Sequence, residues 1–121
     1  MLIISDSIRQ KELKKVEKYF SHEDIKAMAR KVSQGLGTTL RGAAGGRIVK
    51  IKSTFRGVAG RSVFFVITKT NDIFPVLIRL KKDFLGANLT FQNKAFREYF
   101  YRNYRMMEDD LKNDRFEIFE I

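Results

Sequence analysis

The chain has 121 residues, no cysteine, one histidine and a formal net charge of +10 at pH 7, so disulfides, a histidine-based metal site and a Ser-His-Asp triad are not expected. Its length suits one domain with a modest core, which we expect to span residues 1–121. It has no apolar run of the roughly 18 residues that cross a bilayer and no signal-peptide pattern at its start, so we expect a cytoplasmic protein without membrane contact. The single histidine and the lack of a nucleotide-binding glycine motif predict that it uses neither a metal nor a small-molecule cofactor.

The first third of the sequence predicts one short strand and two helices. Residues 2–5 form an apolar run that suits a strand, and a helix is expected over about residues 8–20. Ser21 and Asp24 have the spacing of a capping box, which predicts the start of a second helix. Gly35 ends that helix. Because the link at Ser21 is tight, we expect the two helices to pack as a hairpin.

Three strands joined by short turns, a meander, are expected in the middle of the chain. Apolar and cationic residues alternate in residues 47–55, which places Lys50 and Lys52 on one face of a strand whose other face is buried. Residues 62–68 are nearly all apolar, as in a central strand, and residues 73–80 supply the third strand.

A long helix and a final strand are expected at the C-terminus. The helix should run from about residue 91 to residue 112, and its apolar stripe favours core packing over base stacking. The stripe consists of Phe96, Phe100, Tyr104, Met107 and Leu111. Residues 115–121 alternate like a strand, and the acidic extension 108–121 contains six acidic and two basic residues. This tail is either a sheet-edge strand or a segment that lies over the basic region and restrains it.

Most of the positive charge lies in the predicted meander. Residues 43–85 contain nine Lys or Arg against two Asp or Glu, a local charge of +7. Basic groups presented by a rigid sheet predict a phosphate site, and RNA is the expected polyphosphate. The alternative is a basic strand face that is only solvated.

Three motifs in this region resemble those of a known family. They read GGRIVKIK, GRSVFFVI and VLIRLKKDF, the last followed by NLT. Together with the order of the predicted elements, they resemble the RelE/ParE superfamily of bacterial toxins, in particular its HigB-like branch, over residues 1–112. The resemblance implies an α+β fold with a RelE-like antiparallel sheet and helices packed on one side.

The resemblance also implies a function. It predicts the toxin of a type II toxin–antitoxin pair: a metal-independent endonuclease that cleaves mRNA on the ribosome, blocks translation and is neutralised by a cognate antitoxin. The family's paired strand lysines fall on Lys50 and Lys52, its arginine falls on Arg61, and its later basic residue falls on Lys82. Its catalytic tyrosine has no counterpart in residues 84–88. Further contacts to RNA are expected from Arg47, Arg56, Arg79 and Lys81.

Cleavage of RNA by its own 2′-OH needs a base, cations that stabilise the phosphorane and an acid for the leaving oxygen. A lysine among other cations can have a lowered pKa and act as the base, so Lys52, with Lys50 beside it, is the candidate. Arg61 suits the phosphorane, and Lys81 or Lys82 would supply the acid. Two alternatives stay open: a ParE-like gyrase inhibitor and a non-catalytic nucleic-acid-binding module.

Overall fold

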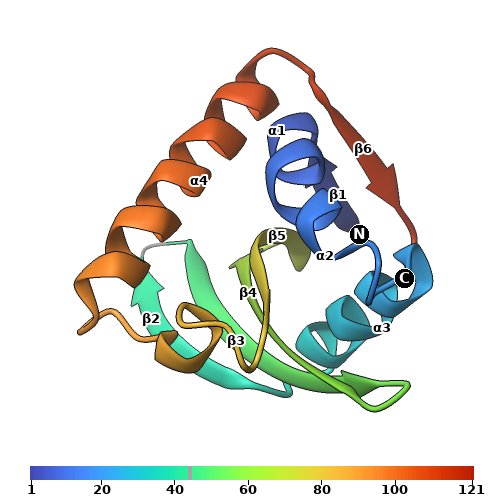
Figure 1. The fold of residues 1–121 in the computed structure, drawn as a ribbon. Helices are drawn as coiled ribbons and strands as arrows, with labels where there is room; N and C mark the ends of the chain where they lie inside the picture. Colours follow the sequence, from blue (N-terminus) through green and yellow to red (C-terminus); the bar gives the residue numbers. More distant parts are fainter. Residues whose placement is uncertain (44) are drawn as a thin grey trace.

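The protein is an α+β structure in which helices cover both faces of a six-stranded mixed sheet (Figure 1). The computed structural model describes residues 1–43 and 45–121; Ala44, in the glycine-rich stretch, lies outside the described residues. The elements are β1 (Leu2–Ser5), α1 (Asp6–Ile8), η1 (Arg9–Leu13), α2 (Lys14–Val16), α3 (His22–Ser33), β2 (Thr38–Ala43), β3 (Gly46–Phe55), β4 (Val58–Ile67), β5 (Asp72–Leu80), η2 (Gly86–Asn88), α4 (Lys94–Lys112) and β6 (Phe116–Phe119). The segments α1, η1 and α2 follow one another without a break, and η1 is π-helical.

The strand order is β2-β3-β4-β5-β1-β6. The predicted antiparallel meander is confirmed as β3, β4 and β5, and the predicted terminal strand is confirmed as β6, which pairs antiparallel with β1. The expectation of an antiparallel sheet is wrong at one place, because β1 runs parallel to β5. The sheet also contains β2, which lies outside the strands predicted from the sequence. This edge strand has a register irregularity between Thr39 and Arg41.

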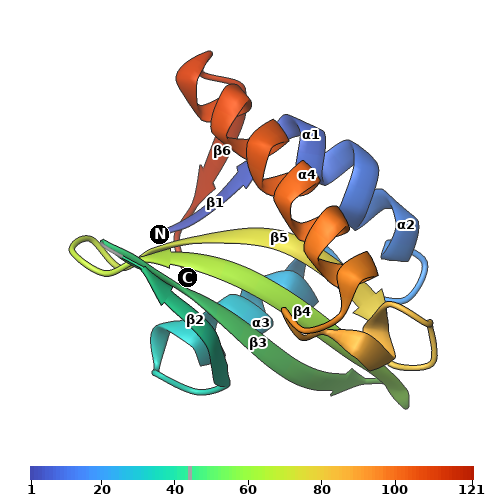
Figure 2. The same ribbon diagram turned by 90° about the vertical axis from the view of Figure 1, so that its left-hand side faces the viewer.

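Helices cover both faces of the sheet, so the predicted hairpin with all helices on one side is wrong (Figure 2). The run α1–α2 and helix α4 share one face, where Glu12 is bonded to Arg79 of β5. Helix α3 covers the other face, where the Lys31 ammonium lies 3.4 Å from the Ser53 hydroxyl of β3. Helices cover both faces because every residue of β5 after Asp72 is buried. A strand that is apolar on both sides needs a layer on each.

Two features predicted for the helices, the capping box of α3 and the apolar stripe of α4, are present in the structure. The capping box of α3 is confirmed: the Ser21 hydroxyl accepts from the Asp24 amide at 3.2 Å, and the Ser21 amide donates to the Asp24 carboxylate at 2.8 Å. The stripe of α4 is core, since Phe96 and Phe100 are at most 1% exposed. In the described part of the chain, no helix is both long and apolar enough to cross a membrane.

Candidate phosphate-binding site

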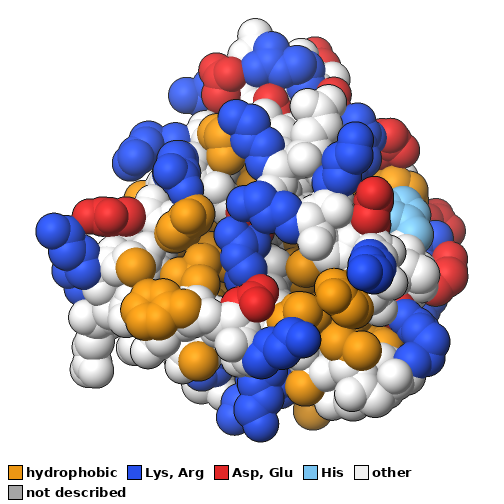
Figure 3. Space-filling model, in the orientation of Figure 1, with side chains coloured by type: hydrophobic (Ala, Val, Ile, Leu, Met, Phe, Trp, Pro, Cys, Tyr) orange, Lys and Arg blue, Asp and Glu red, His pale blue; other side chains and the backbone are white. Residues whose placement is uncertain are grey.

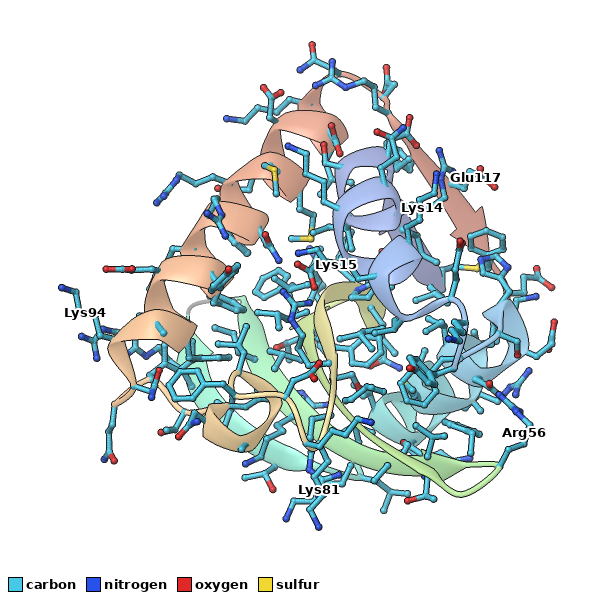
Figure 4. All side chains as sticks on the ribbon, in the orientation of Figure 1. Lys14, Lys15, Arg56, Lys81, Lys94 and Glu117 are labelled. Atoms are coloured by element: carbon cyan, nitrogen blue, oxygen red, sulfur yellow. The ribbon has the colours of Figure 1, made fainter. Side chains whose placement is uncertain are left out.

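Four cationic side chains surround a hollow of about 260 Å³ beside the meander. They are Lys50 and Lys52 of β3, Arg61 of β4, and Lys81, which directly follows β5. The opposite wall is η2 with the residues around it. Figure 4 labels Lys81 at the lower end of the molecule, below the sheet. The structure therefore brings together three of the four predicted catalytic residues and one predicted RNA contact.

The sheet holds these cations close together at an electrostatic cost. Lys52 and Arg61 are direct cross-strand partners, and Lys50 lies two residues along on the same face of β3. Like charges directly opposite one another destabilise a sheet, and an anion in the hollow would relieve this repulsion. Arg61 is oriented by its own strand, because its guanidinium donates to the Gly60 carbonyl at 2.9 Å.

The wall opposite the strands depends on one glycine. A Cβ built on Gly86 would lie 2.0 Å from the Leu80 carbonyl oxygen, so a larger residue cannot occupy this position without a backbone shift. The loop can thus turn back against the end of β5 and enclose the hollow. Lys81 is anchored at the same place, since its amide donates to the Ala59 carbonyl at 2.9 Å.

Lys50 is the lysine whose surroundings favour the neutral form. Its side chain is half-buried, whereas Lys52 is exposed. Burial lowers the pKa of the Lys50 ammonium, and the positive charges of Lys52 and Arg61 lower it further. The roles within the lysine pair are therefore reversed relative to the sequence-based expectation: Lys50 has the environment of a base, and Lys52 is the charge that helps to create it.

Two arginines expected to contact RNA are engaged with carboxylates. Arg79 is 8% exposed and forms a bidentate ion pair with Glu12, which is 1% exposed. The Arg79 guanidinium is therefore not accessible to the phosphate of a bound RNA. Arg56 lies at the β3–β4 turn, where it is bonded to the Asp24 carboxylate and donates to the Tyr19 carbonyl at 2.9 Å. Figure 4 shows Arg56 well apart from Lys81.

The remaining predicted residues lie beside the hollow or behind it. Arg47 falls on the α3 face of β3 by strand alternation, opposite to Lys50. Lys82 lines a neighbouring pocket together with Lys81 and is not among the residues of the hollow. The tyrosines of α4 do not line the hollow either: the Tyr101 hydroxyl accepts from the Arg41 guanidinium at 2.7 Å, and Tyr104 packs against Phe65.

The sequence did not reveal the two carboxylates that form ion pairs with Arg79 and Arg56. Glu12 lies four residues after Ile8, so it shares the buried face of its helix, and this placement was the available signal. Asp24 was interpreted only as a cap, although it also holds Arg56. Spacing in the chain could not reveal that β5 would bring Arg79 beside Glu12, because 67 residues separate the two.

No protein-family model matches this chain, and no curated protein matches it either. The site must therefore be interpreted from its own chemistry. Within residues 1–43 and 45–121, no group of three or more His, Cys, Asp or Glu side chains is placed to hold a metal ion. The hollow contains side-chain cations instead, an arrangement that suits phosphate oxygens.

Proposed function

We propose that this protein is a metal-independent endoribonuclease of the toxin type, and that the hollow binds the phosphate at which RNA is cut. The observation that carries the proposal is Lys50: a half-buried lysine with a lowered pKa that lies beside two further cations. A solvated basic surface would leave its lysines exposed, whereas a lowered pKa favours the neutral amine that a catalytic base requires.

In the proposed reaction, the neutral Lys50 amine takes the proton of a ribose 2′-OH. The 2′-oxygen forms a bond to phosphorus, and the Lys52 and Arg61 cations stabilise the negative charge on the phosphorane. The bond to the 5′-oxygen then breaks, and Lys81 donates a proton to this leaving group. The products are a 2′,3′-cyclic phosphate and a 5′-hydroxyl, and the need for a 2′-OH restricts the reaction to RNA.

The biological setting of the proposal is that of the family the motifs resemble. The substrate is mRNA on the ribosome, the outcome is a block of translation in the cytoplasm, and the partner is a cognate antitoxin protein. The net charge of +10 supports a polyanionic substrate and an antitoxin that covers the cations.

Expression of the protein alone in a bacterium tests the proposal. Growth should stop with a block of protein synthesis, and the double change Lys50→Ala with Lys52→Ala should relieve the arrest. The matched control removes two exposed lysines elsewhere, Lys14→Ala with Lys94→Ala, and should stay toxic. Neither lines the hollow, and Figure 4 shows both well apart from Lys81. Normal growth at confirmed expression of the folded protein would reject the toxin proposal, and arrest with inhibited DNA supercoiling but active translation would replace it with gyrase inhibition.

One observation favours a non-catalytic nucleic-acid-binding module as the second candidate. The polar side chains that line the hollow are all cations, with neither a tyrosine nor a carboxylate among the described lining residues. Incubation with mRNA bound to ribosomes distinguishes the two. Cleavage that stops when one 2′-hydroxyl is replaced by hydrogen supports the enzyme, and tight binding without a cut supports the module.

A further inference from the structure

A second pocket adjoins the hollow and shares Lys81 with it. It has a volume of about 370 Å³, within the range of about 300–1,000 Å³ typical of small-ligand sites. It is lined by one aromatic residue, two lysines and small or apolar residues: Tyr19, Gly57, Val58, Ala59, Leu80, Lys81 and Lys82. We call it the Tyr19 pocket. In the lower part of the molecule, where Figure 4 labels Lys81, Figure 3 shows hydrophobic side chains beside lysines and arginines.

The Tyr19 pocket is built from fixed backbone. The Tyr19 amide donates to the Val16 carbonyl at 2.9 Å, and the Tyr19 carbonyl accepts from Arg56 at 2.9 Å. On the opposite side, the Lys81 amide bonds to the Ala59 carbonyl and ties the end of β5 to β4. A backbone held in this way preorganises the pocket, which reduces the conformational entropy lost when a ligand enters.

The chemistry of the pocket combines an aromatic ring with cations. The Tyr19 ring is only partly buried, and the Lys18 ammonium lies 5.8 Å from its centroid. Lys81 and Lys82 are both exposed beside it. Proteins recognise single-stranded RNA by stacking unpaired bases on aromatic side chains while cations hold the adjoining phosphates.

We infer that the Tyr19 pocket binds the nucleobase of the nucleotide next to the phosphate in the hollow, with Tyr19 as its stacking platform. This inference rests on the proposed function, because the base and the phosphate belong to one RNA strand that passes Lys81. The pocket then sets how the strand is placed over Lys50, and Tyr19 is a substrate-binding residue with no part in the chemistry.

Binding of short single-stranded 2′-O-methyl RNA tests the inference, because this RNA cannot be cleaved through its 2′-oxygen. An abasic residue is moved along the oligonucleotide one position at a time. One position should weaken binding about tenfold, or about 1.4 kcal/mol, as expected for the loss of one stacked base. In Tyr19→Ala this penalty should disappear. In the control Phe84→Ala, which removes a 70%-exposed aromatic side chain that lines neither cavity, the penalty should persist.

The possible outcomes separate the inference from the proposed function. RNA that binds the wild type equally well with and without each base would overturn the inference and leave the phosphate site intact. No binding of RNA at all would reject the proposed function itself. A penalty that disappears in Phe84→Ala but persists in Tyr19→Ala would move the stacking site to the loop and overturn the inference.

A second variant keeps the test decisive if Tyr19→Ala does not fold. The chain contains no tryptophan, so Tyr19→Trp introduces a single indole whose fluorescence reports on the pocket. Intact RNA should quench this fluorescence, and RNA with the critical abasic residue should not do so even at saturation. Unchanged fluorescence with RNA demonstrably bound would show that no base enters the pocket.

Discussion

Arg61 and Arg79 are direct cross-strand partners on β4 and β5, yet only Arg61 faces the hollow. Glu12 accounts for the difference, because it neutralises Arg79 within the layer between the sheet and the helices. One carboxylate therefore separates a structural arginine from a candidate functional one. Without it, two like charges would oppose one another on adjacent buried strands.

Removal of this carboxylate should destabilise the protein strongly. Glu12→Ala leaves the Arg79 guanidinium buried and unpaired, and loss of one partner of a buried pair costs about 3–5 kcal/mol of unfolding free energy. Urea denaturation measures this value. The double variant Glu12→Leu with Arg79→Met replaces the pair with apolar side chains and should recover most of the loss. A cost below about 1 kcal/mol for Glu12→Ala would mean that the pair is not desolvated in solution.

The lowered pKa of Lys50 predicts a pH dependence of cleavage. The base must be neutral, so the rate should rise with pH and level off below the ordinary lysine value of 10.5. Lys52→Ala removes a charge that lowers the pKa of Lys50, so the rising limb should shift to higher pH. Lys50→Arg should lose cleavage about 100-fold or more at every pH and keep its affinity for RNA, because arginine stays protonated. Rate measurements from pH 6 to pH 10 check these expectations, and a profile unchanged in Lys52→Ala would contradict the role given to Lys50.

The four cations of the hollow predict a salt dependence. A site that neutralises about three or four phosphates of a single strand gives a slope of roughly −2 to −3 in a plot of log affinity against log salt. Arg61→Ala should reduce this slope by about 0.7, which is one phosphate contact. Arg47→Ala is the matched control, because Arg47 lies on the opposite face of β3 and should leave the slope unchanged. Equal slopes for all three proteins would indicate that RNA binds elsewhere.

The sequence predicted those features that depend on neighbours in the chain. Alternation along β3 placed Lys50 and Lys52 on one face, and Ser21 with Asp24 fixed the start of α3. It did not predict the side of the sheet that α3 covers, because both strand faces of β5 are apolar and either could have received the helix. The separation of Arg79 from Arg61 also required tertiary information, namely the position of Glu12.

The C-terminal tail gives the last prediction. β6 pairs with β1 at the far edge of the sheet from β2, and three strands separate it from β3 and the lysines of the hollow. This placement favours the sheet-edge strand over the restraining tail. The Phe119 ring packs against His22 at a centroid distance of 4.7 Å, and Phe116 is half-buried.

Deletion of residues 116–121 should therefore lower stability and leave RNA binding unchanged. Loss of two partly buried phenylalanines predicts a decrease of about 2–3 kcal/mol in unfolding free energy, measured by urea denaturation. The deletion retains Arg115, whose guanidinium bonds to Asp110 at 3.1 Å, so the end of α4 stays anchored. The control Glu117→Ala removes only the exposed ion pair with Arg9 and should cost no more than about 0.5 kcal/mol. Tighter RNA binding after the deletion, greatest at low salt where opposing charges are least screened, would show instead that the tail restrains the basic surface.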